Sequence, residues 1–172
     1  MQRLEEEGFT HIAVQSTHVM HGEEYEKMLS QLEPYRLRMK VSVGMPLLHG
    51  EEDYAAVAQA LLNWLPPLGE DEALILMGHG TAHFANSAYA QMEHVLQERC
   101  DRVYLATVEG YPTLESVERQ LAKRPDIRRL MLAPFMLVAG DHARNDMSGD
   151  EDSWAGQLKK AGYPVRCILQ GL

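Results

Sequence analysis

The sequence has few of the features that mark secreted, membrane-embedded or disulfide-bonded proteins. It has only two cysteines among 172 residues, Cys100 and Cys167, which lie far apart and in no metal-ligand spacing. We expect both to be reduced thiols in a cytoplasmic protein. No apolar window is long enough to span a bilayer, and the first residues form no apolar signal region. The protein is therefore expected to be neither secreted nor embedded in a membrane.

An excess of positive charge is also missing. The chain has 16 Lys and Arg against 25 Asp and Glu, which gives a formal net charge of −9. A nucleic-acid-binding protein needs a basic face, so we expect no nucleic acid as partner. The remaining composition, 45% hydrophobic and 24% charged, is ordinary for a globular protein. The length suits one domain or two small lobes with a real core.

The chain alternates between strand patterns and helix patterns. Apolar or alternating runs predict strands at 11–19, 39–48, 73–79, 102–108, 128–138 and 165–169. Amphipathic or capped stretches predict helices at 1–7, 22–37, 51–65, 84–99, 113–123 and 153–161. Regular alternation of this kind is typical of βαβ units, so we predict an α/β fold with parallel sheets. The acidic stretch 146–152 is predicted to be a solvated connection.

A faint internal repeat relates the two ends of the chain. Residues 12–24 can be laid on residues 130–142, because each is an apolar strand followed by a glycine and an acid. If the halves are similar, the first-half partners of strands 73–79 and 102–108 would precede residue 1. The repeat therefore predicts that the chain lacks a front end.

This repeat also predicts how the chain divides into lobes. We expect a partial N-terminal lobe over residues 1–66, with two parallel strands in place of about four. Residues 67–172 would form a C-terminal lobe with four strands. An unpaired strand edge is a template for association, so we expect a homo-oligomer, domain swapping or low stability.

Polar side chains follow three of the predicted buried strands. His79 ends one strand between Gly78 and Gly80, which let a ligand approach the backbone closely. Glu109 follows the run VYLATV, and His142 follows the long apolar run that ends at residue 139. The carboxyl ends of parallel strands share one edge, where α/β sheets bind ligands. Two imidazoles and a carboxylate there would suit a divalent first-row metal and leave coordination positions open. The alternative for each residue alone is a hydrogen-bonded turn residue.

The other histidines are expected to have lesser roles. His18, His21 and His83 also lie near predicted strand ends, and we expect them to line a cleft rather than bind metal. His11 and His94 are expected to be ordinary strand and helix residues. Three methionines are expected to fill the core and not to act as ligands: Met77, Met131 and Met136.

The motifs together resemble a known family. MGHGTAHFA, TVEGYPTLESV and LAPFMLVAGDHARNDMSGDEDSW, with VQSTHVMHGEEYEK and VGMPLL nearer the N-terminus, resemble the anaerobic sirohydrochlorin cobaltochelatases of the CbiK type. The resemblance implies a class II chelatase fold, in which two Rossmann-like lobes face each other across a cleft that holds a tetrapyrrole. Family members begin with a strand leading into SFGTS and a long helical stretch, and they end with GLGE and a last helix. Those segments are missing here, in agreement with the repeat.

The resemblance also implies a metal site and a reaction. The histidine of GHG, the glutamate of VExYP and the histidine of GDH hold the metal in that family, and they correspond here to His79, Glu109 and His142. The implied activity is insertion of Co²⁺ into sirohydrochlorin in anaerobic cobalamin biosynthesis, with release of two protons and no organic cofactor. We expect His79 to be the base, while His142 and Glu109 hold the metal during transfer.

Residues that contact the tetrapyrrole are less well defined by the sequence. Sirohydrochlorin carries many carboxylates, and Arg144 is the candidate cation near the predicted site. His18 and His83 are the other expected tetrapyrrole contacts. Two alternatives remain: a sirohydrochlorin chelatase for iron or nickel, because the ligand set discriminates poorly between these metals, and a truncated, non-catalytic relative that binds metal or tetrapyrrole.

Overall fold

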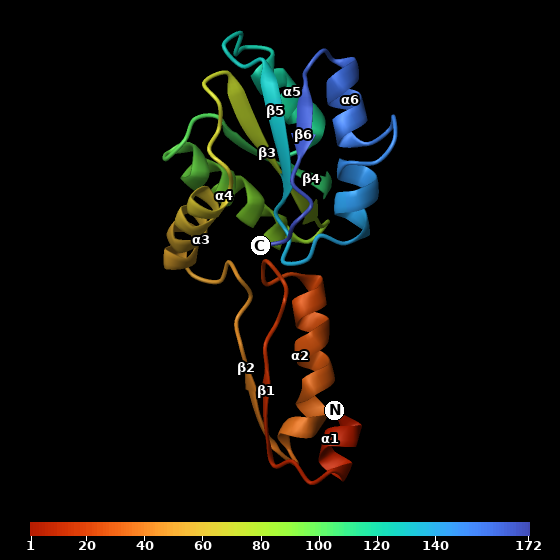
Figure 1. Ribbon diagram of the computed structural model, residues 1–172. Coiled ribbons are helices and arrows are strands. Elements are labelled where there is room, and N and C mark those ends of the chain that lie inside the picture. Colours follow the sequence, from red (N-terminus) through yellow and green to blue (C-terminus); the bar gives the residue numbers. More distant parts are fainter.

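The computed structural model describes residues 1–172 and contains two sheets in which every strand pairing is parallel (Figure 1). A small sheet pairs β1 with β2, and a large sheet has the order β4-β3-β5-β6. Helices alternate with the strands along the chain. The predicted α/β class with parallel sheets is therefore confirmed. None of the helices has the length and apolar character needed to cross a membrane.

The small sheet and its helices are formed by the N-terminal quarter of the chain. The elements are α1 (Gln2–Glu6), β1 (His11–Val14), α2 (Glu23–Arg36) and β2 (Lys40–Val43). Three acids in the first turn of α2 favour a helix start there, because they face the positive end of the helix dipole. Figure 1 shows this unit extending away from the large sheet, with α2 beside β1 and β2.

Both strands of the small sheet are shorter than the sequence predicted. The regular ladder ends at Val14 and Val43, and the two segments pair again only at an isolated bridge between Met20 and Leu48. Pro46 lies in the gap and has no N–H to donate to a ladder. The Gln15 side chain donates there to the Met45 carbonyl oxygen. The predicted strands 11–19 and 39–48 are thus interrupted by a local loop.

The large sheet and its helices are formed by the rest of the chain. The elements are α3 (Glu51–Trp64), β3 (Glu72–Gly80), η1 (Phe84–Asn86), α4 (Ser87–Gln97), β4 (Val103–Glu109), α5 (Leu114–Leu121), β5 (Arg129–Pro134), η2 (His142–Met147), α6 (Trp154–Lys160) and β6 (Val165–Cys167). Every predicted strand and helix is present, with boundaries that shift by a few residues. η2 is the exception, because the sequence predicted no helical segment there.

Helices cover both faces of the large sheet. Leu74 and Leu76 of β3 point into a core shared with α3 and α4, whereas Ile75 and Met77 point into a core shared with α5, α6 and η2. A strand covered on both faces has no polar face to expose, which explains the near-continuous apolar run in β3. Figure 1 shows α3 and α4 on one side of the sheet and α6 on the other.

The order of the strands places a crevice at the end of β3. β4 pairs with one edge of β3 and β5 with the other, while α4 and α5 lie on opposite faces. The connections therefore diverge between β3 and β5. Open α/β sheets bind ligands at the carboxyl ends of strands where such a divergence occurs.

The helix α3 packs with the large sheet. Tyr54, Ala58 and Leu61 lie in the same core as Leu74 and Leu76, although α3 follows β2 directly in the chain. The chain therefore passes from the small unit to the large one before α3. The division at residue 66, like the truncation of the first lobe, stays a prediction.

An ion pair joins β3 to β6 and should make stability depend on pH. The Arg166 guanidinium donates to both carboxylate oxygens of Glu72 at 2.7 and 2.8 Å, and the Glu72 side chain is only 7% exposed. The hydrogen bond from Arg166 lowers the pKa of Glu72 from its ordinary value of 4.5. The pair should therefore stabilise the fold fully above about pH 4.5, and this contribution should be lost as the pH falls through the lowered pKa.

Arg166→Met should lower the free energy of unfolding by about 2 kcal/mol near pH 7. This is below the ~3–5 kcal/mol for breaking a fully buried pair, because the Arg166 side chain is 44% exposed. Urea unfolding at about pH 3 and about pH 7 measures the difference, which should shrink at the lower pH. Arg3→Met is the control and should have no measurable effect, since Arg3 and Glu7 are both exposed. An equal loss at both pH values would contradict this role for Glu72.

Candidate functional site

His79 and Glu109 lie next to each other at the carboxyl edge of the large sheet. Gly80, one residue after His79, is paired in register with Glu109 of the neighbouring strand. Gly80 has a φ of +84°, and a side chain there would collide with the Glu109 carbonyl oxygen. Glycine is therefore required where the two strand ends approach most closely.

His142 reaches the same edge from a short π-helix, not directly from a strand end. β5 ends at Pro134, and His142 is the first residue of η2. The sequence had placed His142 in a polar turn at the end of a strand running to residue 138, which is wrong in its local structure. The ring centroids of His79 and His142 are nevertheless 4.7 Å apart, with an interplanar angle of 86°. The fold therefore brings the two predicted histidines together at the divergence between β3 and β5.

Hydrogen bonds fix which nitrogen of each imidazole is free. Nδ1 of His79 lies 2.8 Å from the Gly80 carbonyl oxygen, and Nδ1 of His142 contacts a carboxylate oxygen of Asp146. A carbonyl or carboxylate oxygen only accepts, so Nδ1 must donate in both residues. In the neutral rings Nε2 then carries the lone pair. This is the form in which an imidazole can bind a metal or accept a proton.

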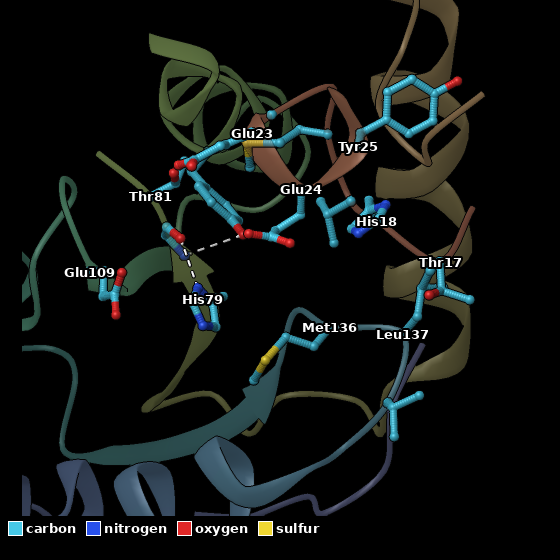
Figure 2. A pocket seen from close by; sticks show the side chains of 16 residues that line it. Thr17, His18, Glu23, Glu24, Tyr25, His79, Thr81, Glu109, Met136 and Leu137 are labelled. Atoms are coloured by element: carbon cyan, nitrogen blue, oxygen red, sulfur yellow. Dashed lines mark hydrogen bonds between the residues drawn. The ribbon is translucent and has the colours of Figure 1, made fainter. Parts of the chain in front are cut away.

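A cavity of about 460 Å³ opens above His79, between the large sheet and the small unit (Figure 2). One wall contains His79, Thr81 and Glu109, and the opposite wall comes from residues 17–20 and 22–25, with His18 among them. Leu137 and its two neighbours in the chain add an apolar patch. The volume lies within the range of small-molecule sites.

The lining of this cavity is acidic. Glu23, Glu24 and Glu109 line it, whereas no lysine or arginine does. The Lys27 ammonium lies 2.8 Å from Glu24 and 2.9 Å from Glu23, outside the cavity. The hydrogen bond from Lys27 lowers the pKa of Glu24, so this carboxylate stays ionised at neutral pH. A cavity with these side chains favours cations.

No three side chains of the types His, Cys, Asp and Glu are arranged to hold one metal ion together. Figure 2 shows Glu109 to one side of His79 and Met136 to the other. The distance between the imidazoles of His79 and His142 is short enough for one ion to bridge them. The convergence of all three predicted ligands on one ion stays a prediction.

Comparison with known proteins identifies the family. The sequence profile described as "Cobalt chelatase (CbiK)" matches residues 1–172. The chain belongs to this family. It is 37% identical over 174 residues to the sirohydrochlorin cobaltochelatase of Salmonella typhimurium strain LT2, covering all of this chain and 66% of that protein. It is 36% identical over 173 residues to the sirohydrochlorin cobaltochelatase CbiKC of Nitratidesulfovibrio vulgaris strain Hildenborough, covering 98% of this chain and 60% of that protein. The chain thus spans less than two thirds of the length of these relatives.

A solved structure shares the fold of this cobalt chelatase family member. The structure of SirB from Bacillus subtilis with Fe³⁺ superposes with a TM-score of 0.61 at 19% sequence identity, covering 96% of this chain and 66% of the other. This likeness shows the fold alone. With the family match, it confirms the resemblance that the motifs carried.

The other expected site residues of this cobalt chelatase family member lie at different distances from the cavity. His18 lines it, and its Nδ1 lies 2.8 Å from the Ser16 hydroxyl. His83 lies outside the lining, with Nε2 3.9 Å from a Glu26 carboxylate oxygen. Arg144 is exposed on η2 and does not line the cavity. Their expected roles as tetrapyrrole contacts stay predictions.

The remaining expectations concern residues beside the site. His21 packs on Tyr25 with ring centroids 4.6 Å apart and does not line the cavity, although the sequence grouped it with cleft residues. His11 and His94 lie in β1 and α4, as expected. Two of the three methionines, Met77 and Met131, are buried in the core, but Met136 lines the cavity.

Sequence reasoning expected His18 from the small unit at the cavity but missed four other lining residues. Glu23, Glu24 and Tyr25 line it from the start of α2, and Tyr89 lines it from α4. The hydroxyl oxygen of Tyr89 accepts a long hydrogen bond of 3.4 Å from the Gly80 backbone N–H. The signal was available for the residues of α2, since they begin the helix that follows a strand of the small sheet. The acids had been explained by the helix dipole alone.

Proposed function

We propose that this chain inserts Co²⁺ into sirohydrochlorin, with His79, Glu109 and His142 as the groups that hold the metal substrate. The observation that supports this most directly is the pair of imidazoles 4.7 Å apart, each with its Nδ1 engaged and its Nε2 free. His79 lines an acidic cavity, His142 adjoins His79 without lining the cavity, and the chain is a member of the cobalt chelatase family. Relatives that share more than a third of its residues are named sirohydrochlorin cobaltochelatases.

The chemistry requires a metal-binding group and a proton acceptor at the same place. Insertion joins a divalent cation to the ring and releases two pyrrole N–H protons. During transfer His142 and Glu109 hold the cation at the sheet edge, while Nε2 of His79, no longer bound to the cation, accepts the two ring protons in turn and passes each to water. Neutral imidazole can accept protons near neutral pH, and the Glu109 carboxylate offsets part of the charge on the cation.

The tetrapyrrole would enter between the two units. The apolar patch around Leu137 suits the flat macrocycle, and His18 contacts the ring from the opposite wall. Arg144 and His83, outside the cavity, would meet the peripheral carboxylates of the ring. Sirohydrochlorin is thus the proposed small-molecule partner.

An insertion assay tests this proposal. The purified chain is mixed anaerobically with sirohydrochlorin and, separately, with Co²⁺, Fe²⁺ or Ni²⁺, and the absorption change of the ring is followed. We expect cobalt insertion well above the uncatalysed rate. If iron or nickel is inserted faster than cobalt, the proposed metal substrate is wrong and the faster metal takes its place. Binding of metal or ring without insertion would overturn it in favour of a non-catalytic binder.

Glu109→Gln should weaken metal binding less than loss of either histidine. The amide oxygen can still coordinate, but it brings no negative charge. We expect Co²⁺ affinity to fall by about 10-fold, near the lower limit for changes around a metal site. Isothermal titration with Co²⁺ measures this. Glu98→Gln is the control, since Glu98 follows α4, is exposed outside the cavity and pairs with exposed His94. An unchanged affinity in Glu109→Gln would remove Glu109 from the site.

A further inference from the structure

Asp146 contacts His142 across one turn of the π-helix η2. Its carboxylate contacts Nδ1 of the imidazole, whereas Nε2 is the proposed metal-binding nitrogen. Asp146 is not among the residues that line the cavity. Asp146 therefore contacts the proposed metal-binding histidine without lining the cavity.

As a stabilising contact this pair would contribute little. The His142 and Asp146 side chains are 40% and 44% exposed, and exposed ion pairs contribute little to folding because water screens them. The pair can still decide the tautomer of the imidazole, because a single acceptor at Nδ1 determines which ring nitrogen carries the proton. A free histidine side chain in water favours the tautomer protonated at Nε2, which cannot bind metal through that atom.

Three histidines of the structure show how local partners set the tautomer. The Gly80 carbonyl oxygen holds the proton of His79 on Nδ1, and Asp146 does the same for His142. His83 is the opposite case, since its Nδ1 accepts a hydrogen bond from the Ala85 backbone N–H. Neutral His83 therefore has its proton on Nε2. The two rings that pack edge to face, His79 and His142, are the two with Nε2 free.

We propose that Asp146 is a positioning residue that holds His142 in the Nδ1–H tautomer and keeps its Nε2 free for the metal substrate. Carboxylates that accept a hydrogen bond from the second ring nitrogen commonly orient metal-binding histidines. The catalytic consequence rests on the proposed function. The tautomer of His142 does not, and it can be observed in the purified chain without turnover.

The test combines a tautomer measurement with metal titration. Long-range ¹H–¹⁵N spectra of the purified chain distinguish Nδ1–H from Nε2–H rings, and comparison with His142→Gln assigns the signal. Asp146→Ala is the variant, and Asp141→Ala is the matched control. Asp141 precedes His142 and carries the same charge, and its side chain makes no capping hydrogen bond. Co²⁺ affinity and insertion rate are then measured for each protein.

We expect Nδ1–H in the wild-type ring and a shift toward Nε2–H in Asp146→Ala. Co²⁺ binding should weaken by about 10–100-fold in that variant. Asp141→Ala should weaken it by at most about fivefold, the range of a screened charge contact. The melting temperature should change little in either. A wild-type Nε2–H ring, or equal losses in the two variants, would overturn the role of Asp146. Retained tautomer and affinity effects in a chain that inserts no metal would overturn the proposed function alone.

Discussion

Replacing either His79 or His142 with alanine should abolish cobalt insertion. The ring centroids of the two imidazoles are 4.7 Å apart, so each replacement removes one proposed metal-binding atom and leaves the other ring without its neighbour. His79 is also the proposed proton acceptor. Loss of a positioned acid or base alone slows reactions by roughly 10²–10⁴-fold. We expect losses of at least that size for both variants in the insertion assay.

The matched control for this result is His83→Ala. It removes an imidazole from the connection that follows β3, and Nδ1 of this ring accepts from a backbone N–H, so its Nε2 carries the proton in the neutral form. Its effect should be clearly smaller than that of either facing histidine. Equal losses in the three alanine variants would mean that the facing pair has no special role, and the metal site would have to be sought elsewhere.

Gly80→Ala should have the largest effect on the fold. A methyl group there would lie within the van der Waals radius of the Glu109 carbonyl oxygen, and the φ of +84° disfavours any side chain. The colliding atom is backbone, so the ends of β3 and β4 would have to separate. We expect the free energy of unfolding to fall by more than about 3 kcal/mol, as strain and overpacking add. The same separation would displace His79 from Glu109.

Gly162→Ala is the control for the backbone conformation. Gly162 also has a positive φ, +98°, but a methyl group there would meet no atom within 4 Å. Its loss should be about 1 kcal/mol, the cost of the left-handed conformation alone. Urea unfolding of both variants measures the difference. Similar losses of stability in the two variants would show that contact with the Glu109 backbone contributes little at Gly80.

Most of the large sheet could be predicted because its signals are local. The run from Ala73 to Met77 is apolar throughout, since β3 is covered on both faces, and Gly78 and Gly80 mark its end. Parallel pairing then follows from strand–helix alternation, and parallel strands share a carboxyl edge. His79 and Glu109 were placed together by this reasoning alone. The positions of these two proposed site residues were thus predicted from the ends of the strands.

The remaining features depend on contacts that no local pattern records. The break in the small sheet arises where the Gln15 side chain reaches Met45 across the gap beside Pro46. η2 was expected to be a turn, because its residues are polar and follow Gly140. Buried Ala143 and Met147 pack it against the core beneath the sheet. Its contact between His142 and Asp146 therefore could not be foreseen.

The acidic lining has a consequence for the order in which two substrates of opposite charge arrive. Three carboxylates line a cavity that no lysine or arginine lines, and Lys27, outside it, offsets only part of their charge. A divalent cation is drawn into such a field, whereas a ring carrying many carboxylates is repelled by it, and the repulsion weakens once the cation is in place. On the proposed function, cobalt therefore arrives first and the tetrapyrrole second. The bound cation then acts as the counter-ion of the ring carboxylates. Dissolved salt screens the same field, so it should slow the binding of the cation and speed the binding of the tetrapyrrole.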